Sequence, residues 1–189
     1  MLKNIHTPVQ LMEHLDENIE YGVIDKNGNK FTDSSSEKFQ FVCNNEWFLR
    51  PVQQILLDKI GHCYDQVEIE RYWFENNNYE VKTFWISAYQ PEIENSGFSH
   101  TYLLFKENNQ WKLFEHSDYY NRGIFSFNSL NEAIIFQAKN QIETAEKCLK
   151  PEKAYSVCIK EYLKPKTNLN MTEFLEFINN SKDINVDMF

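Results

Sequence analysis

The feature that most constrains the fold is a change of hydrophobic period in the middle of the chain. Residues 63 to 75 are rich in helix formers and place Val67 and Phe74 at helical spacing. Soon afterwards, VKTFWISAY (81–89) is β-branched and aromatic, which is typical of a strand buried on both faces. A helix that gives way to strands in this manner predicts an α+β fold.

The second half of the chain predicts further antiparallel strands. The stretch HTYLLFKENNQWKLFEHSD (100–118) reads as a strand, a polar turn at 107–110 and a returning strand. It follows a loop at 90–98, and residues 122–127 could add a short strand. After Pro151, AYSVCIKEYL (154–163) predicts one more strand. The sheet is therefore expected to be mostly antiparallel.

Helix-capping residues predict where the helices that flank this sheet begin. Thr7, Pro8 and Gln10 supply a hydroxyl cap, a proline in the first turn and a capping-box glutamine, so a helix should run to about residue 20. Ser129 and Glu132 form a second capping box, which opens a long helix with an apolar stripe up to Leu149. Two shorter helices are predicted at VQQILLDKI (52–60), ended by Gly61, and at NMTEFLEFINN (170–180).

Between the first two helices the sequence predicts a hairpin and a loop. Asn27-Gly28 lies between short apolar runs, which is a hairpin signal, and DSSSEK (33–38) is rich in loop formers. The chain of 189 residues suits a single domain over 1–189, since no linker or internal repeat interrupts it.

Composition excludes several classes of partner. The chain has 19 Lys and Arg against 28 Asp and Glu, a net charge of −9, and its basic residues form no stripe. This balance argues against nucleic acid or an anionic membrane as a partner. No stretch has the length of a signal peptide's apolar region or of a membrane span, so a cytoplasmic location is expected. The four cysteines show no paired spacing, which favours free thiols over disulfides.

Cys63 is the first candidate for chemistry, because it follows Gly61 and opens the predicted helix. A thiol in the first turn of a helix faces unpaired backbone N–H groups and the positive end of the dipole, which lowers its pKa. The same N–H groups can hold an oxyanion. Free cysteine is also among the most buried residue types, so a packing role is the alternative interpretation.

Two downstream residues complete a candidate set. His100 begins a predicted strand, and Glu115 lies near the end of the returning strand, on the face of Trp111 and Leu113. A tight turn at 107–110 would bring this carboxylate near His100, where it could orient the imidazole. Asp118 is a second candidate for the acid, although it falls outside the strand register.

At these anchors the chain resembles the transglutaminase-like family of papain-like cysteine enzymes. The family's G-x-C-x-[DE] start of the nucleophile helix is matched by Gly61, Cys63 and Asp65. Its histidine heads an apolar strand, as His100 heads TYLLF, and its acid lies four residues after a tryptophan, as Glu115 does after Trp111. The acid of the family is usually aspartate, so the glutamate is a departure. The resemblance covers about residues 55 to 118.

The resemblance implies a nucleophile helix packed on a mostly antiparallel sheet with flanking helices, and a catalytic core at about residues 50–128 with additions at both ends. It implies acyl transfer through a thioester on Cys63, with His100 as general base and Glu115 holding the imidazole. The substrate would be a peptide, a protein or a small amide, and no cofactor or metal is implied. Hydrolysis is favoured over amine transfer by analogy with family members of this size.

Three alternatives stay open at this point. The fold could be a catalytically silent papain-like scaffold that acts as a protein-binding module, or a plain α+β binding domain with Cys63 and His100 in its core. His62 beside Cys63 and His116 beside Glu115 also raise the possibility of a metal site, but no C-x-x-C or H-x-x-x-H spacing supports zinc. Asp65 and Gln66 could cap the Cys63 helix or face the site, but a solvated turn of the helix is the favoured interpretation. Oligomeric state is not readable from the sequence.

Overall fold

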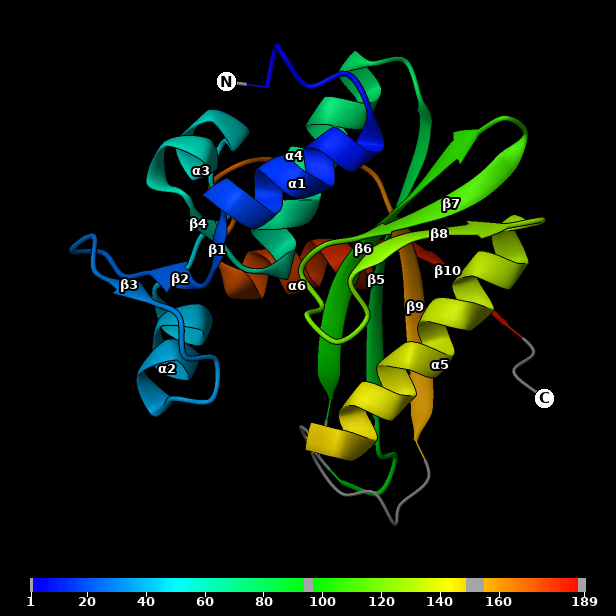
Figure 1. Cartoon of the computed structure of the whole chain (residues 1–189). Helices are drawn as coiled ribbons and strands as arrows, with labels where there is room; N and C mark the ends of the chain where they lie inside the picture. Colours follow the sequence, from blue (N-terminus) through cyan, green and yellow to red (C-terminus); the bar gives the residue numbers. More distant parts are fainter. Residues whose placement is uncertain (1, 94–96, 149–154, 187–189) are drawn as a thin grey trace.

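The computed structural model describes residues 2–93, 97–148 and 155–186 (Figure 1). Its centre is a six-stranded antiparallel sheet with the strand order β10-β9-β5-β6-β7-β8. The long strands β5 and β6 lie in the middle, where both faces can be covered. The strands are β5 (Glu80–Tyr89), β6 (Phe98–Glu107), β7 (Gln110–Glu115), β8 (Gly123–Phe127), β9 (Ser156–Tyr162) and β10 (Lys182–Asp183).

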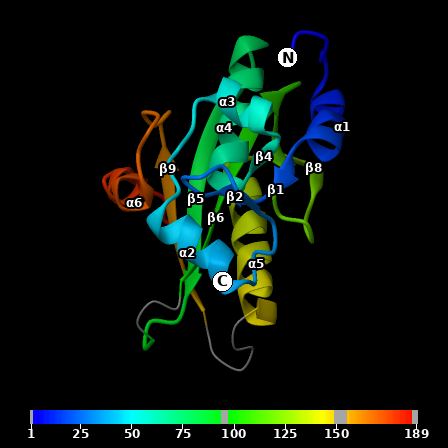
Figure 2. The same cartoon turned by 90° about the vertical axis from the view of Figure 1, so that its left-hand side faces the viewer.

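Helices cover both faces of the sheet. The described residues form α1 (Pro8–Asn18), α2 (Glu37–Asn45), α3 (Val52–Asp58), α4 (Cys63–Asn76), α5 (Leu130–Cys148) and α6 (Met171–Asn179). Alternation along β6 separates the two cores: Leu103 and Phe105 pack with α1, α3 and α4, whereas Tyr102 and Leu104 pack with α5. Figure 1 shows α5 laid across the strands, and Figure 2 shows α6 beside β9 and α1 toward β8. The molecule is thus an α+β protein with a mostly antiparallel sheet.

A third cluster gathers around the beginning of α4. Tyr64 there contacts the rings of Trp47 and of Phe174 in α6, and the same cluster includes Phe39 of α2 and Tyr162 of β9. The first turn of α4 is therefore held from four directions, by segments that are far apart in the sequence. Such packing fixes the position of Cys63, the first residue of this helix.

Short strands tie the N-terminal segment to the same place. β1 (Glu20–Tyr21) pairs in parallel with β4 (Ile60–Gly61), so that Tyr21 lies opposite Gly61. The next strands, β2 (Val23–Ile24) and β3 (Lys30–Phe31), form an antiparallel hairpin. Gly28 in its turn has φ +83°, a conformation that glycine adopts freely.

Most elements expected from the sequence are confirmed. Thr7 and Ser129 accept hydrogen bonds from the backbone N–H groups of Gln10 and Glu132, as the two capping boxes predict. The turn between β6 and β7 uses Asn108 and Asn109 at positive φ, which gives a tight hairpin. The predicted loop at 90–98, helix end at Leu149 and strand start at Ala154 include positions 94–96, 149 and 154, which lie outside the described residues.

Other expectations are wrong or incomplete. Gly61 does not end α3: the helix stops at Asp58, where Lys59 takes a left-handed conformation (φ +57°), and Gly61 belongs to β4 instead. The sequence predicts a loop at 33–38 but not the helix α2, which begins within it at Glu37, and the pairing of β1 with β4 and the strand β10 were also not predicted. Among the described residues, no helix is both long and apolar enough to cross a membrane.

Candidate active site

The site forms where the start of α4 meets the edge of β6. β7 pairs with β6 only from Leu103 onward, so β7 leaves the edge of β6 uncovered near His100 and Thr101. Cys63 lies at this edge, and the backbone of Thr101 hydrogen-bonds its sulfur. Because Cys63 approaches β6 from its edge, it reaches His100. The rest of α4 packs mainly on the face of β6 opposite to His100.

Cys63, His100 and Glu115 form a hydrogen-bonded chain. The Nε2 atom of His100 lies 2.8 Å from Oε2 of Glu115. The Cys63 side chain hydrogen-bonds the same imidazole, which leaves Nδ1 as the nitrogen that faces the sulfur. All three side chains are buried. The structure therefore brings together the cysteine, the histidine and the first-choice acid that the sequence singles out.

The carboxylate of Asp118 does not take part in this chain. It accepts hydrogen bonds from the backbone of Tyr120 and the side chain of Asn121. The backbone N–H of Asp118 instead donates to Oε1 of Glu115 over 2.9 Å, and Gln137 of α5 donates to Oε2 at 3.4 Å. Asp118 thus helps to fix Glu115, which holds its second oxygen on His100.

The electrostatics of the site favour a thiolate and an imidazolium. Burial alone raises the pKa of Cys63, but the hydrogen bond with His100 and the charge of His62 outweigh it, so the pKa lies below its ordinary value of 9.0. Burial alone lowers the pKa of His100, but the Glu115 carboxylate and the bond to Cys63 hold that pKa well above its usual range. The pair is therefore arranged so that the proton rests on the imidazole.

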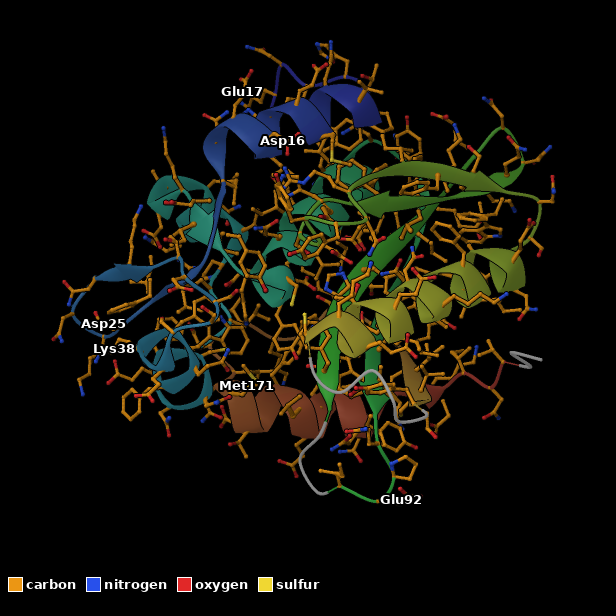
Figure 3. The ribbon with its side chains drawn as sticks, turned by 60° about the horizontal axis from the view of Figure 1, so that its bottom comes forward. Asp16, Glu17, Asp25, Lys38, Glu92 and Met171 are labelled. Carbon is orange, nitrogen blue, oxygen red and sulfur yellow. The ribbon has the colours of Figure 1, made fainter. Side chains whose placement is uncertain are left out.

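A cavity of about 720 Å³ opens beside the sulfur. It is lined by Cys63, His62, Tyr64 and Trp85, together with side chains of α2. Figure 3 shows Met171, another lining residue, at the start of α6 on the side toward α2. This volume falls within the usual range of small-molecule and side-chain pockets, which is about 300 to 1,000 Å³.

Tyr21 is a member of the site that the sequence did not suggest. Its hydroxyl hydrogen-bonds Cys63, and burial together with the nearby thiols keeps its pKa well above 10.0, so the hydroxyl keeps its proton. Tyr21 reaches the sulfur because β1 pairs with β4, which directly precedes the first turn of α4. Nothing in the local sequence of a two-residue strand signals that contact.

The expectation that Asp65 and Gln66 lie on a solvated turn is wrong. Both side chains are fully buried. Asp65 binds His62, Trp47 and Arg50, with Arg50 at 3.2 Å, while Gln66 donates to the carbonyl of Gly61 over 2.7 Å. These contacts anchor the first turn of α4 to the segment that precedes it, which makes the orientation of Cys63 a property of several distant residues.

Gly61 is required by close packing. A Cβ atom on Gly61 would meet the Cβ of Asp65 at 2.8 Å and a methyl group of Ile55 at 3.2 Å. Its φ is not in the left-handed region, so the demand is for space rather than for an unusual backbone. The glycine two residues before the cysteine therefore lets β4 run directly against the start of α4.

Comparison with known proteins adds no assignment to this geometry. No protein-family model matches the chain, and no curated protein matches it either. Within the described residues, no group of three or more His, Cys, Asp or Glu side chains is arranged to hold a metal ion. Interpretation of the site therefore starts from the chemistry of its own side chains.

Proposed function

We propose that the chain is a cysteine-dependent acyl-transfer enzyme of papain-like, transglutaminase-like type, which hydrolyses a peptide or carboxamide bond through a thioester on Cys63. One observation carries this proposal: a thiol in the first turn of a helix, an imidazole and a carboxylate form one hydrogen-bonded chain beside a cavity. A buried cysteine that only fills space needs neither a histidine partner nor a carboxylate behind that histidine.

Before the first half-reaction, the proton of the Cys63 thiol already rests on Nδ1 of His100. The thiolate attacks the carbonyl carbon, and the C–S bond forms as the carbonyl π electrons move onto oxygen. As the tetrahedral intermediate collapses, the C–N bond breaks and the amine leaves with the proton from His100. Glu115 keeps the imidazole in place and stabilises its charged form.

In the second half-reaction, water attacks the thioester and gives its proton to His100. The C–S bond breaks, the product leaves as a carboxylic acid, and the thiolate of Cys63 is paired again with the protonated imidazole. These steps use only side chains of the chain and water. The thiol chemistry suits a reducing compartment, which agrees with the proposed cytoplasmic location.

The lining of the cavity favours an uncharged acyl group. Among the lining residues that the structure describes there is no Asp, Glu, Lys or Arg, and the polar members are hydroxyls, amides, thiols and one histidine. Aromatic side chains, including Phe39, Trp85 and Phe98, supply apolar surface. The substrate class is accordingly a peptide, a protein or a small amide that presents a neutral group at the point of attack.

Acylation with an activated ester tests the proposal. Incubation with p-nitrophenyl acetate should release p-nitrophenol and add one acetyl group, which peptide mapping by mass spectrometry should place on Cys63. Cys63→Ser should lose this adduct, whereas Cys158→Ser, a matched change at a half-buried thiol on β9, should retain it. A native protein without the adduct would favour the rival interpretation, a silent papain-like scaffold that binds other proteins.

A further inference from the structure

His62, directly before Cys63, is held more tightly than a surface histidine, and one of its ring nitrogens has no strong acceptor. Its side chain is 3% exposed and lies between the rings of Trp47 and Tyr64, at 4.9 and 4.8 Å between centroids. Nδ1 lies 3.1 Å from Oδ2 of Asp65. Nε2 is buried and has no well-formed hydrogen bond within the described residues; the other polar neighbour of the ring is the thiol of Cys43, which is only a weak acceptor.

The partners of His62 keep the ring charged. Burial alone lowers its pKa, but the hydrogen bond and charge of Asp65 outweigh burial and raise the pKa to about 10, with a further contribution from the nearby thiol of Cys43. Asp65 in turn stays ionised because His62 and Arg50 surround it, which lowers its pKa despite complete burial. Near neutral pH both ring nitrogens therefore carry a proton.

His62, which carries this Nε2 atom, belongs to the candidate site. His62 and Cys63 line the same cavity, and the charge of His62 is one of the causes that lower the pKa of Cys63. No Lys or Arg lines that cavity within the described residues, so His62 is its strongest hydrogen-bond donor. A buried charged donor whose nearest acceptor is a weak thiol costs stability, which a stronger acceptor supplied by a substrate would recover.

We propose that His62 is a further catalytic residue, whose Nε2–H donates a hydrogen bond to the carbonyl oxygen of the acyl group that Cys63 attacks. This inference rests on the proposed function and adds to it a side-chain donor for the oxyanion, beside the backbone N–H groups at the start of α4. His62 keeps its proton throughout. As the C–S bond forms, negative charge develops on the substrate oxygen, and a fixed charged donor stabilises it more than it stabilises the neutral carbonyl.

Packing and capping alone do not explain this arrangement. Asp65 satisfies the backbone N–H of His62 and binds Nδ1, and those contacts would serve equally with Nε2 turned toward a protein acceptor. Instead the tilted and edge-on contacts with Trp47 and Tyr64 and the bond to Asp65 hold the ring so that Nε2 has no strong acceptor. Preorganised donors of this kind act without reorganisation at the moment of reaction.

The test compares two reactions of the same thiol. Alkylation by iodoacetamide develops no carbonyl oxyanion, whereas acetylation by p-nitrophenyl acetate passes through one as the C–S bond forms and p-nitrophenolate leaves. Both rate constants are measured across pH and compared at their plateaus, where Cys63 is fully ionised, so that an altered pKa of the thiol does not affect the comparison. The readout is the ratio of acetylation to alkylation for each variant.

His62→Leu should lower this ratio by about 100- to 1,000-fold, the usual effect of removing one oxyanion donor. His62→Gln, which offers a neutral N–H donor on a shorter side chain, should lower it less. Both rate constants of a ratio come from one protein sample, so the ratios of the two variants can be compared. If the leucine variant does not fold, the glutamine variant alone tests the role of His62. His6→Leu, a matched change at an exposed histidine, should leave the ratio unchanged.

Equal loss of both rates in the His62 variants, or no loss, would overturn the inference and leave the proposed function standing. Failure of the unmodified protein to acetylate Cys63 would remove the proposed function, and this inference with it.

Discussion

Two buried histidines flank Glu115 in different ways, and their pKa values shift in opposite directions. His100 of β6 contacts Glu115, and His116, the residue after it, contacts Asp16 of α1 at 3.1 Å. Both imidazoles therefore have a carboxylate partner. Yet the pKa of His100 lies well above its usual range, whereas that of His116 falls from 6.5 to about 4.

The difference lies in what else each carboxylate binds. Asp16 also forms an ion pair with Arg122, and burial together with the charge of Arg122 outweighs the pull of Asp16 on the proton of His116. Figure 3 places Asp16 on the side of α1 that faces the body of the molecule, with Glu17 on the opposite side. Glu115 makes no ion pair with Lys or Arg in the described part of the chain, so no cation competes with His100 for its carboxylate.

The comparison separates a structural histidine from a chemical one. His116 also lies 2.6 Å from the amide oxygen of Gln66, so its ring joins α1, α4 and the loop after β7. His100 instead has Cys63 on its second nitrogen and holds a proton that can be transferred. Contact with a carboxylate is common to both, and the absence of a competing cation is what distinguishes His100.

Removal of each imidazole ring should give the largest difference between the two histidines. His100→Ala should slow alkylation of Cys63 by iodoacetamide near neutral pH by about 100-fold, because the thiolate loses its imidazolium partner. His116→Ala should change this rate by less than about threefold and act on stability instead. Alkylation followed by mass spectrometry gives the rate, and thermal unfolding gives the stability. Equal slowing in both variants would remove the distinction between the two histidines.

The two acids give the next largest contrast. Glu115→Gln should slow the same alkylation by about tenfold near neutral pH, because the imidazolium loses its anionic partner. Asp118→Asn should have an effect of less than about twofold, since only its backbone N–H touches Glu115. If Asp118→Asn proves the slower variant, the third member of the site is Asp118. If neither change matters while His100→Ala does, the site is a Cys–His dyad.

The smallest expected effect tests why the pKa of His116 is low. Arg122→Gln should raise the pKa of His116 by about one unit, because a cation that opposes protonation is removed and Asp16 is released to favour it. Nuclear magnetic resonance of the imidazole signals during a pH titration measures the shift. A pKa that stays at about 4 would mean that burial alone keeps His116 neutral.

The sequence predicted the three-residue chain because each step was local. The glycine and helix signals placed Cys63 in a first turn, and the tight turn at Asn108 and Asn109 fixed the register of β7 on β6. Once that register is set, Glu115 lies at the end of its strand nearest His100. Strand alternation also kept Glu115 and His116 on opposite faces, as their different partners require.

The residues that surround Cys63 could not be predicted from the sequence in the same way. Asp65 looked like an ordinary acidic residue on a helix turn, because its partners Trp47 and Arg50 come from another segment. For the same reason the role of His62 was hidden, since its charge depends on Asp65. The helix α2 did leave a signal: Ser36 caps its start and accepts from Phe39, but the serine-rich context suggested a loop.

The most direct test of the account is the pH dependence of Cys63 alkylation in the unmodified protein. A lowered thiol pKa means that the thiolate forms at lower pH, so the rate should reach half its plateau clearly below pH 9.0. In His100→Ala this midpoint should move upward, because burial, which raises the pKa of the thiol, then loses its main opponent. A midpoint at or above pH 9.0 in the unmodified protein, or one that does not move in the variant, would contradict the assignment of Cys63 as an activated nucleophile.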